Sequence, residues 1–123
     1  MSADDHAKQE IAQLVKNYCT ALETLKPATV RSLFHLDNER ELKDKYKEYK
    51  SLKCQVTAPP DYDRLDSSAS GGAQFKIGMK QVVQMRSGGA PATLDLNVTM
   101  VVSRKDFQSA WLIDRVSYEV KPK

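Results

Sequence analysis

Two stretches near the C-terminus follow the pattern of half-buried β-strands. Residues 93–102 alternate between apolar and polar side chains, and the apolar positions are Leu94, Leu96, Val98, Met100 and Val102. Residues 110–120 are as rich in aromatic and β-branched residues and contain the only tryptophan, Trp111. Residues 103–109 connect the two runs, so the pattern predicts an antiparallel strand pair whose apolar face must be covered.

Two more strands are predicted before this pair. Residues 52–56 alternate in the same way until Pro59-Pro60 interrupts them, which predicts an edge strand or a strand bent at the prolines. A longer strand is predicted over about residues 74–86, with apolar positions at Phe75, Ile77, Met79, Val83 and Met85. Gly- and Ser-containing turns at residues 66–72 and 87–91 separate these strands.

The first half of the chain has helical periodicity instead. An amphipathic helix is predicted from about residue 4 to residue 25, with an apolar stripe formed by Ile11, Leu14, Val15, Tyr18, Leu22 and Leu25. Pro27 ends this helix and can open a short second one that finishes near residue 36. Asn38 with Glu41 three residues later resembles a capping box, which predicts a third helix over residues 39 to about 50.

Three helices followed by about four antiparallel strands are typical of an α+β fold, in which the helices cover one face of a curled sheet. A chain of 123 residues is long enough for one core, so we expect a single domain over residues 1–123. Hydrophobic residues make up 41% of the chain and charged residues 28%, which favours an ordinary globular protein over a disordered or membrane-embedded one.

The distribution of charge argues against nucleic acid as a partner. The chain has 19 basic and 16 acidic residues, and the two signs are interspersed rather than gathered in one stripe. Residues 39–50 are densely charged, but Glu39–Lys43 and Glu41–Lys45 have the spacing of favourable ion pairs on a helix. We interpret this run as a solvated helix face and not as a basic aromatic patch for nucleic acid.

The hydropathy pattern of the chain indicates where in the cell the protein could be located. No apolar run is long enough to cross a bilayer, so a membrane span is not expected. The polar start is not followed by the apolar segment of a secretory signal, which favours the cytoplasm if Met1 is the natural start and leaves the location open if the chain is an excised domain.

Cys19 and Cys54 lie 35 residues apart, without the close spacing of zinc or redox motifs. We interpret them as two small buried hydrophobic side chains. The alternative is a disulfide, which would require an oxidising compartment and Cα atoms close enough to be bridged.

Two polar residues interrupt the apolar phase of the strands. Gln81 stands between Met79 and Val83, and Asp114 stands in the last predicted strand. A polar side chain at such a position needs a hydrogen-bond partner or a wet cavity. Both residues could line a pocket between helices and sheet; alternatively the phase slips at a bulge and they face solvent, which is the interpretation we prefer for Asp114.

Three segments together resemble the nuclear transport factor 2-like superfamily, also called SnoaL-like or cystatin-like. They are residues 11–22, residues 30–34 and the run Trp111-Leu112-Ile113-Asp114-Arg115-Val116. The resemblance covers nearly the whole chain and implies a cone, in which a curved antiparallel sheet wraps around the long first helix and leaves a cavity at the open end. It also implies a choice of roles, because members include ketosteroid isomerases, dehydratases and non-catalytic binding or dimerisation domains.

The isomerase role can be compared residue by residue. Such an enzyme needs a carboxylate base and an oxyanion hole, which in that family includes a tyrosine on the first helix and a protonated aspartate on a strand. Tyr18 matches the tyrosine. The segment that would carry the base is here only residues 36–38, and the strand aspartate would fall near the apolar Val98. These departures argue against isomerase chemistry, and we interpret Tyr18 as a core residue whose hydroxyl reaches a polar partner.

Histidine chemistry is not expected either. Dehydratase-type members rely on a His–Asp pair in the cavity, and no predicted strand of this chain carries a histidine. His6 and His35 lack the spacing of metal ligands, so we expect structural or surface roles for them, with no metal and no cofactor.

The layout is most similar to accessory domains of bacterial multidomain proteins, in which a short second helix leads directly into a charged third helix. The leading hypothesis is a non-catalytic small-ligand-binding or dimerisation module, with a homodimer formed through the outer face of the sheet. The apolar contacts on that face would come from Val82, Val101 and either Trp111 with Ile113 or Leu112 with Val116.

The alternative hypothesis is an enzyme or carrier of the ketosteroid isomerase or dehydratase type that acts on a small apolar ligand in the cone. The residues predicted to line its pocket are Tyr18, Tyr46, Met79, Gln81 and Asp114.

Overall fold

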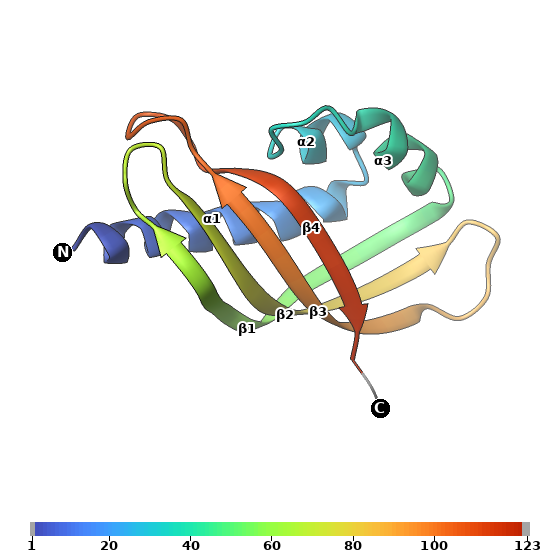
Figure 1. Cartoon of the computed structure of the whole chain (residues 1–123). Helices are drawn as coiled ribbons and strands as arrows, with labels where there is room; N and C mark the ends of the chain where they lie inside the picture. The colour runs from blue at the N-terminus through green and yellow to red at the C-terminus, as the bar shows by residue number, and fades with distance from the viewer. Residues whose placement is uncertain (1, 122–123) are drawn as a thin grey trace.

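The first helix, α1 (Ala3–Thr24), forms because its sequence supplies both a cap and an apolar stripe. The computed structural model describes residues 2–121, and in it the Ser2 hydroxyl oxygen accepts a hydrogen bond from the Asp5 N–H at 3.1 Å. The helix ends at Leu25, whose φ of 54° is left-handed. The stripe predicted from the sequence is buried, and α1 lies across the concave side of the sheet (Figure 1).

The two short helices are shorter than the sequence predicts. Helix α2 (Pro27–Arg31) stops before residue 36, because the chain then extends and Phe34 forms a parallel bridge with Ile113. Helix α3 (Glu39–Tyr46) stops before residue 50, because Tyr49 already begins the first strand. The predicted capping box is wrong: in the described chain the Asn38 side chain makes no capping bond, and the Asp37 carboxylate accepts the Glu39 N–H at 3.1 Å.

Four antiparallel strands follow in the spatial order β1-β2-β3-β4 (Figure 1). They are β1 (Tyr49–Asp66), β2 (Gly72–Met85), β3 (Ala92–Ser103) and β4 (Leu112–Val120). Strand β1 is an edge strand as predicted, and its register with β2 shifts on both sides of Ala58 as the chain enters Pro59-Pro60. The concave face contributes the core side chains Phe75, Ile77, Met79, Val98 and Met100, which α1 covers.

Strand β4 contains a bulge at Asp114. Val101 pairs with Arg115 and Val102 pairs with Ile113, so Asp114 is an extra residue on β4. The bulge changes which side chains face inward: Ile113 is fully buried before it, and Val116 packs against the core after it. The expectation that one whole pair of apolar residues on this strand faces outward is therefore wrong.

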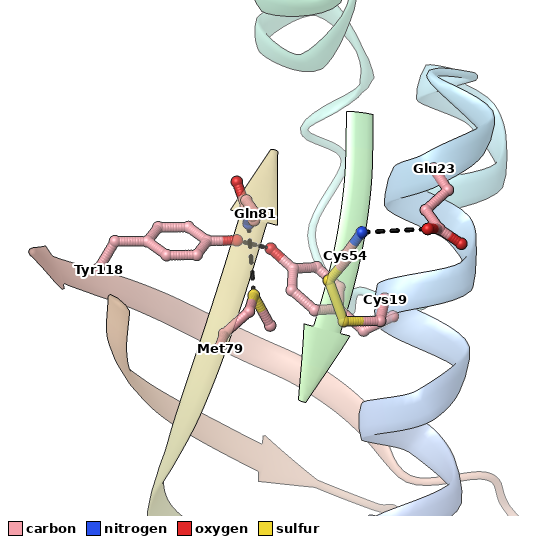
Figure 2. The surroundings of a disulfide bond; sticks show 7 residues. Cys19, Glu23, Cys54, Met79, Gln81 and Tyr118 are labelled. Carbon is pink, nitrogen blue, oxygen red and sulfur yellow. Dashed lines mark hydrogen bonds between the residues drawn. A yellow bond between two sulfur atoms is a disulfide. The ribbon is translucent and has the colours of Figure 1, made fainter. Parts of the chain in front are cut away.

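The two cysteines form a disulfide bond, so their interpretation as separate buried residues is wrong. Cys19 on α1 and Cys54 on β1 have Cα atoms 5.3 Å apart, which is a normal separation for a disulfide. The Glu23 carboxylate accepts the Cys54 N–H at 3.0 Å beside this bond (Figure 2). The C-terminal half of α1 is thus attached to the edge strand β1 by a covalent bond and a hydrogen bond.

No helix among residues 2–121 has the length and hydrophobicity needed to cross a membrane.

Candidate functional site

A cluster of polar side chains lies inside the cone, between α1 and the concave face of the sheet. The Tyr18 hydroxyl is hydrogen-bonded to the hydroxyl of Tyr118 on β4 (Figure 2). Tyr18 is buried, whereas 40% of Tyr118 is exposed, because its ring reaches the surface while its hydroxyl is directed inward to Tyr18. The expectation that the Tyr18 hydroxyl finds a polar partner is thereby met.

Gln81 lies beside this tyrosine pair on β2. Its side chain is buried, and its Nε2 donates to the Met79 sulfur at 3.3 Å (Figure 2). Gln81 is also directly across from Cys54 in the β1–β2 pairing, so the disulfide borders the cluster. Of the two placements considered for Gln81, the structure has the one that faces the interior. We call Tyr18, Tyr118 and Gln81, together with the nearby Tyr46, the tyrosine cluster.

The ionisation of the tyrosine cluster decides its chemistry. Burial raises the pKa of Tyr18 well above its ordinary value, and the adjacent Tyr118 hydroxyl raises it further. Burial likewise raises the pKa of Tyr46 and of Tyr118. These phenols are therefore neutral at neutral pH and can donate hydrogen bonds, but they offer no base for proton abstraction.

The interior of the cone is filled by side chains. Met79 is completely buried, Tyr18 and Tyr46 nearly so, and the Tyr18 hydroxyl bonds to another side chain of the protein. Surface hollows of the described residues lie elsewhere, beside α1, beside α2 and on the outer face of the sheet, and Tyr18, Tyr46, Met79 and Gln81 line none of these. A ligand that reached the tyrosine cluster would have to displace side chains.

Asp114, the remaining predicted pocket residue, lies apart and faces His35. One of its carboxylate oxygens is 3.9 Å from His35 Nε2, which is itself 3.1 Å from both the carbonyl oxygen and the hydroxyl of Ser103. The carbonyl oxygen can only accept, so a bond to it requires the proton on Nε2, whereas the hydroxyl can donate to Nε2 in the other tautomer. This pairing was missed by sequence reasoning, because His35 lies in the connection between two helices and Asp114 lies at a bulge.

A second buried polar group, Arg104, lies between two strand connections and the first half of α1. Arg104, in the β3–β4 connection, is only 7% exposed, and its guanidinium lies against the Trp111 and Phe107 rings, 4.6 and 5.0 Å from their centroids. It donates to the carbonyl oxygens of Ser67 and Ser68 in the β1–β2 turn. Arg104 therefore joins two strand connections and has a structural role.

Metal chemistry finds no support in the arrangement of ligand side chains. Within residues 2–121, no group of three or more His, Cys, Asp or Glu side chains could hold a metal ion. The polar groups of the tyrosine cluster are phenols and an amide, which are also poor metal ligands in their neutral forms.

No protein-family model matches the sequence, and no curated protein matches it either. Solved structures, in contrast, match over nearly the whole chain. A nuclear transport factor 2-like superfamily protein from Salmonella enterica serovar Typhimurium superposes with a TM-score of 0.76 at 17% identity, covering 97% of this chain and 94% of that one. A candidate scytalone dehydratase from Novosphingobium aromaticivorans gives 0.81 at 10% identity, covering 98% and 87%.

A third similar structure is a candidate calcium/calmodulin-dependent protein kinase II association domain from Xanthomonas campestris. It gives a TM-score of 0.70 at 16% identity, covering 93% of this chain and 87% of that one. Identities this low establish the fold alone. The chain has the nuclear transport factor 2-like fold, as the sequence resemblance implied, and a binding or catalytic role has to be argued from its own residues.

Proposed function

We propose that this chain, a single domain with the nuclear transport factor 2-like fold, is a non-catalytic interaction module that forms a homodimer through the outer face of its sheet. The observation that carries the proposal is the hydrogen bond between the Tyr18 and Tyr118 hydroxyls. The polar groups that an enzyme of this fold would turn toward a substrate are here bonded to each other. The composition of the tyrosine cluster agrees with this, because its neutral phenols and its amide offer no general base at neutral pH.

The outer face of the sheet has the mixed character of an interface between identical subunits. Val82 and Val101 are half-buried there, as is Leu112 near the start of β4. A hollow on the same face is lined by side chains of both signs, namely Asp61, Lys76, Glu119 and Lys121. A two-fold interface brings one patch against a copy of itself, so a patch with both charges can be complementary to itself. The Xanthomonas neighbour is named as an association domain, which favours the same kind of role.

Sedimentation velocity over a wide concentration range tests the proposal. We expect a dimer that dissociates on dilution and a Val101→Glu variant that has lost the face contact and associates more weakly, because the new carboxylate would be desolvated in the interface. The matched control is Lys16→Glu, an exposed change on α1 away from the sheet. A wild-type protein that is monomeric at every concentration, or a Val101→Glu variant that dimerises normally, would overturn the face contact.

The second candidate is a small-molecule enzyme or carrier, and the pairing of His35 with Asp114 is the observation that favours it. In this structure His35 Nε2 is 3.1 Å from both Ser103 oxygens and 3.9 Å from the Asp114 carboxylate, so the two side chains would have to move closer before a proton could pass between them. Native mass spectrometry of the purified protein tests this candidate, because a retained small molecule appears as added mass. Loss of that mass in Tyr18→Phe, Gln81→Leu or Asp114→Asn variants would identify the residues that hold it.

The disulfide bears on where the protein acts. Disulfides persist in oxidising compartments and are rare where glutathione keeps thiols reduced. The Cys19–Cys54 bond thus supports an oxidising compartment and argues against the cytoplasmic location expected from the start of the chain. Alkylation of the freshly isolated natural protein before and after reduction would decide between the two locations.

A further inference from the structure

The two edges of the sheet are protected to very different degrees. Along β1, Pro59-Pro60 and register shifts interrupt the free edge, and Glu23 accepts the outward N–H of Cys54. These are devices that prevent a sheet edge from pairing with another strand. The free edge of β4 has none of them beyond the bulge at Asp114. Two apolar side chains at this edge are exposed, Tyr118 by 40% and Val120 by 63%.

The hydrogen-bond pattern shows which backbone groups of β4 are free. The Lys121 N–H bonds to the Asp95 carbonyl at 2.9 Å, so the residues two and four positions before Lys121 also direct their backbone groups toward β3. The alternate residues are Val116, Tyr118 and Val120, whose N–H and C=O groups point away from the sheet. The outward groups of Ile113 are already used, because its N–H bonds to Leu33 and its C=O accepts from His35. The free backbone groups of this edge therefore lie in the segment 116–120.

We propose that this edge pairs with the same edge of a second copy, strand β4 running antiparallel to its mate about a two-fold axis at Ser117. Val116 of each copy then lies opposite Tyr118 of the other, and both residues have outward backbone groups, as an antiparallel hydrogen-bonded pair requires. This contact is separate from the face contact proposed above and does not rest on it.

The same register is the one that the charges favour. Arg115 and Glu119 are exposed on the convex side of β4, and pairing about Ser117 places Arg115 of each copy opposite Glu119 of the other. Two ion pairs form at once, by symmetry. Centring the axis on Tyr118 would instead place Arg115 opposite Lys121, and like charges directly across a strand pair are destabilising. Charge complementarity thus selects one register among those that the backbone allows.

Charge reversal tests the contact directly. We expect Arg115→Glu and Glu119→Arg to raise the dimer dissociation constant by about tenfold each, because each change turns two attractive cross-strand pairs into repulsive ones. The double variant Arg115→Glu/Glu119→Arg should recover the wild-type value, since it restores both pairs with their signs exchanged. The two side chains are four residues apart on one strand and cannot form an ion pair within one copy, so recovery can only come from the intermolecular contact. A double variant as weak as the single ones would overturn the proposal.

Cross-linking provides a second test that does not depend on charge. At the axis, Ser117 faces its own copy in a non-hydrogen-bonded pair, where Cα atoms are about 4.5 Å apart and a disulfide can form. We expect Ser117→Cys to give a covalent dimer under mild oxidation. The control is Thr99→Cys on the neighbouring strand, because Thr99 pairs with Ser117 in the sheet and would lie about 14 Å from its mate, three strand spacings away. No cross-link at Ser117, or a cross-link at Thr99 alone, would overturn the edge contact, and the second result would support the face contact instead.

Discussion

Tyr18 and Cys19 are neighbours on α1, and their side chains bond to opposite edges of the sheet. The Tyr18 hydroxyl bonds to Tyr118 on β4, whereas Cys19 forms the disulfide with Cys54 on β1. Because β1 and β4 are the two outermost strands, one turn of helix holds both edges of the curled sheet. Two adjacent residues therefore connect α1 to both outer strands, one through a hydrogen bond and the other through a covalent bond.

Replacing Tyr18 with Phe removes the hydrogen bond of this pair and leaves the ring in place. We expect the free energy of unfolding to fall by about 1–2 kcal/mol, because the Tyr118 hydroxyl loses its partner inside the cone. Urea denaturation followed by tryptophan fluorescence measures the change. Tyr62→Phe is the matched control, since the Tyr62 hydroxyl has no partner within residues 2–121; an equal loss in both variants would contradict the assigned role of Tyr18.

Stability should decrease above about pH 10 in a way that depends on the buried phenols. Burial raises the pKa of Tyr18, Tyr46 and Tyr118, so in alkali the unfolded chain releases these protons before the folded chain does. The unfolded state then binds fewer protons, and the free energy of unfolding falls as pH rises, by about 1.4 kcal/mol per pH unit for each retained proton. Below the ordinary tyrosine pKa this contribution is fully present.

The Tyr18→Phe variant isolates one of these protons. Its free energy of unfolding should fall less steeply with pH above about pH 10 than that of the wild type, because lysines and the other tyrosines are common to both proteins. Urea denaturation at several alkaline pH values gives the two slopes. Identical slopes would mean that Tyr18 ionises as readily in the folded state as in the unfolded state.

Removing the disulfide should be the most destabilising of these changes. For a loop of this length, we expect Cys19→Ser to lower the free energy of unfolding by about 3–4 kcal/mol, largely because the unfolded chain gains freedom. Dithiothreitol should have a similar effect on the wild type and no further effect on the variant. A wild-type protein whose stability does not respond to the reductant would show that the bond does not form in solution.

Arg104→Lys tests the structural role of the buried guanidinium. A lysine keeps the charge but cannot bond to the Ser67 and Ser68 carbonyls in the same fork or stack on Trp111, so we expect a loss of about 2–3 kcal/mol. Thermal denaturation compares it with Lys105→Ala, an exposed change at the next position that should be nearly neutral. Equal melting temperatures for the two variants would contradict the role assigned to Arg104.

Regular periodicity made the long elements predictable. The bounds of α1 differ from the expected ones by one residue at each end, and β2 and β3 agree within two residues at each end. In these segments apolar side chains face the core at every helical turn or at every second strand residue, so the periodic pattern is repeated many times in the sequence. The short helices carry it only once or twice, and their ends were misplaced.

Only part of the tyrosine cluster was predicted from the sequence. Tyr18 and Gln81 stood out because they interrupt or join an apolar phase, but Tyr118 follows the bulge at Asp114, which changes the phase of β4. Tyr118 could have been found from the period-two spacing of Val116, Tyr118 and Val120, if these residues had been considered separately from Leu112, which precedes the bulge. The disulfide could not be inferred either, since it depends on how α1 lies against β1 and not on any local pattern.

The disulfide also turns part of the chain into a covalent ring. Residues 19 to 54 are closed on themselves, and α2 and α3 both lie entirely within this ring. A protease that cuts the exposed charged stretch between α3 and β1 would leave two fragments still joined by the disulfide, one carrying α1, α2 and α3 and the other the sheet. The segment that contains the two short helices can therefore be cleaved while the disulfide keeps α1 attached to the sheet.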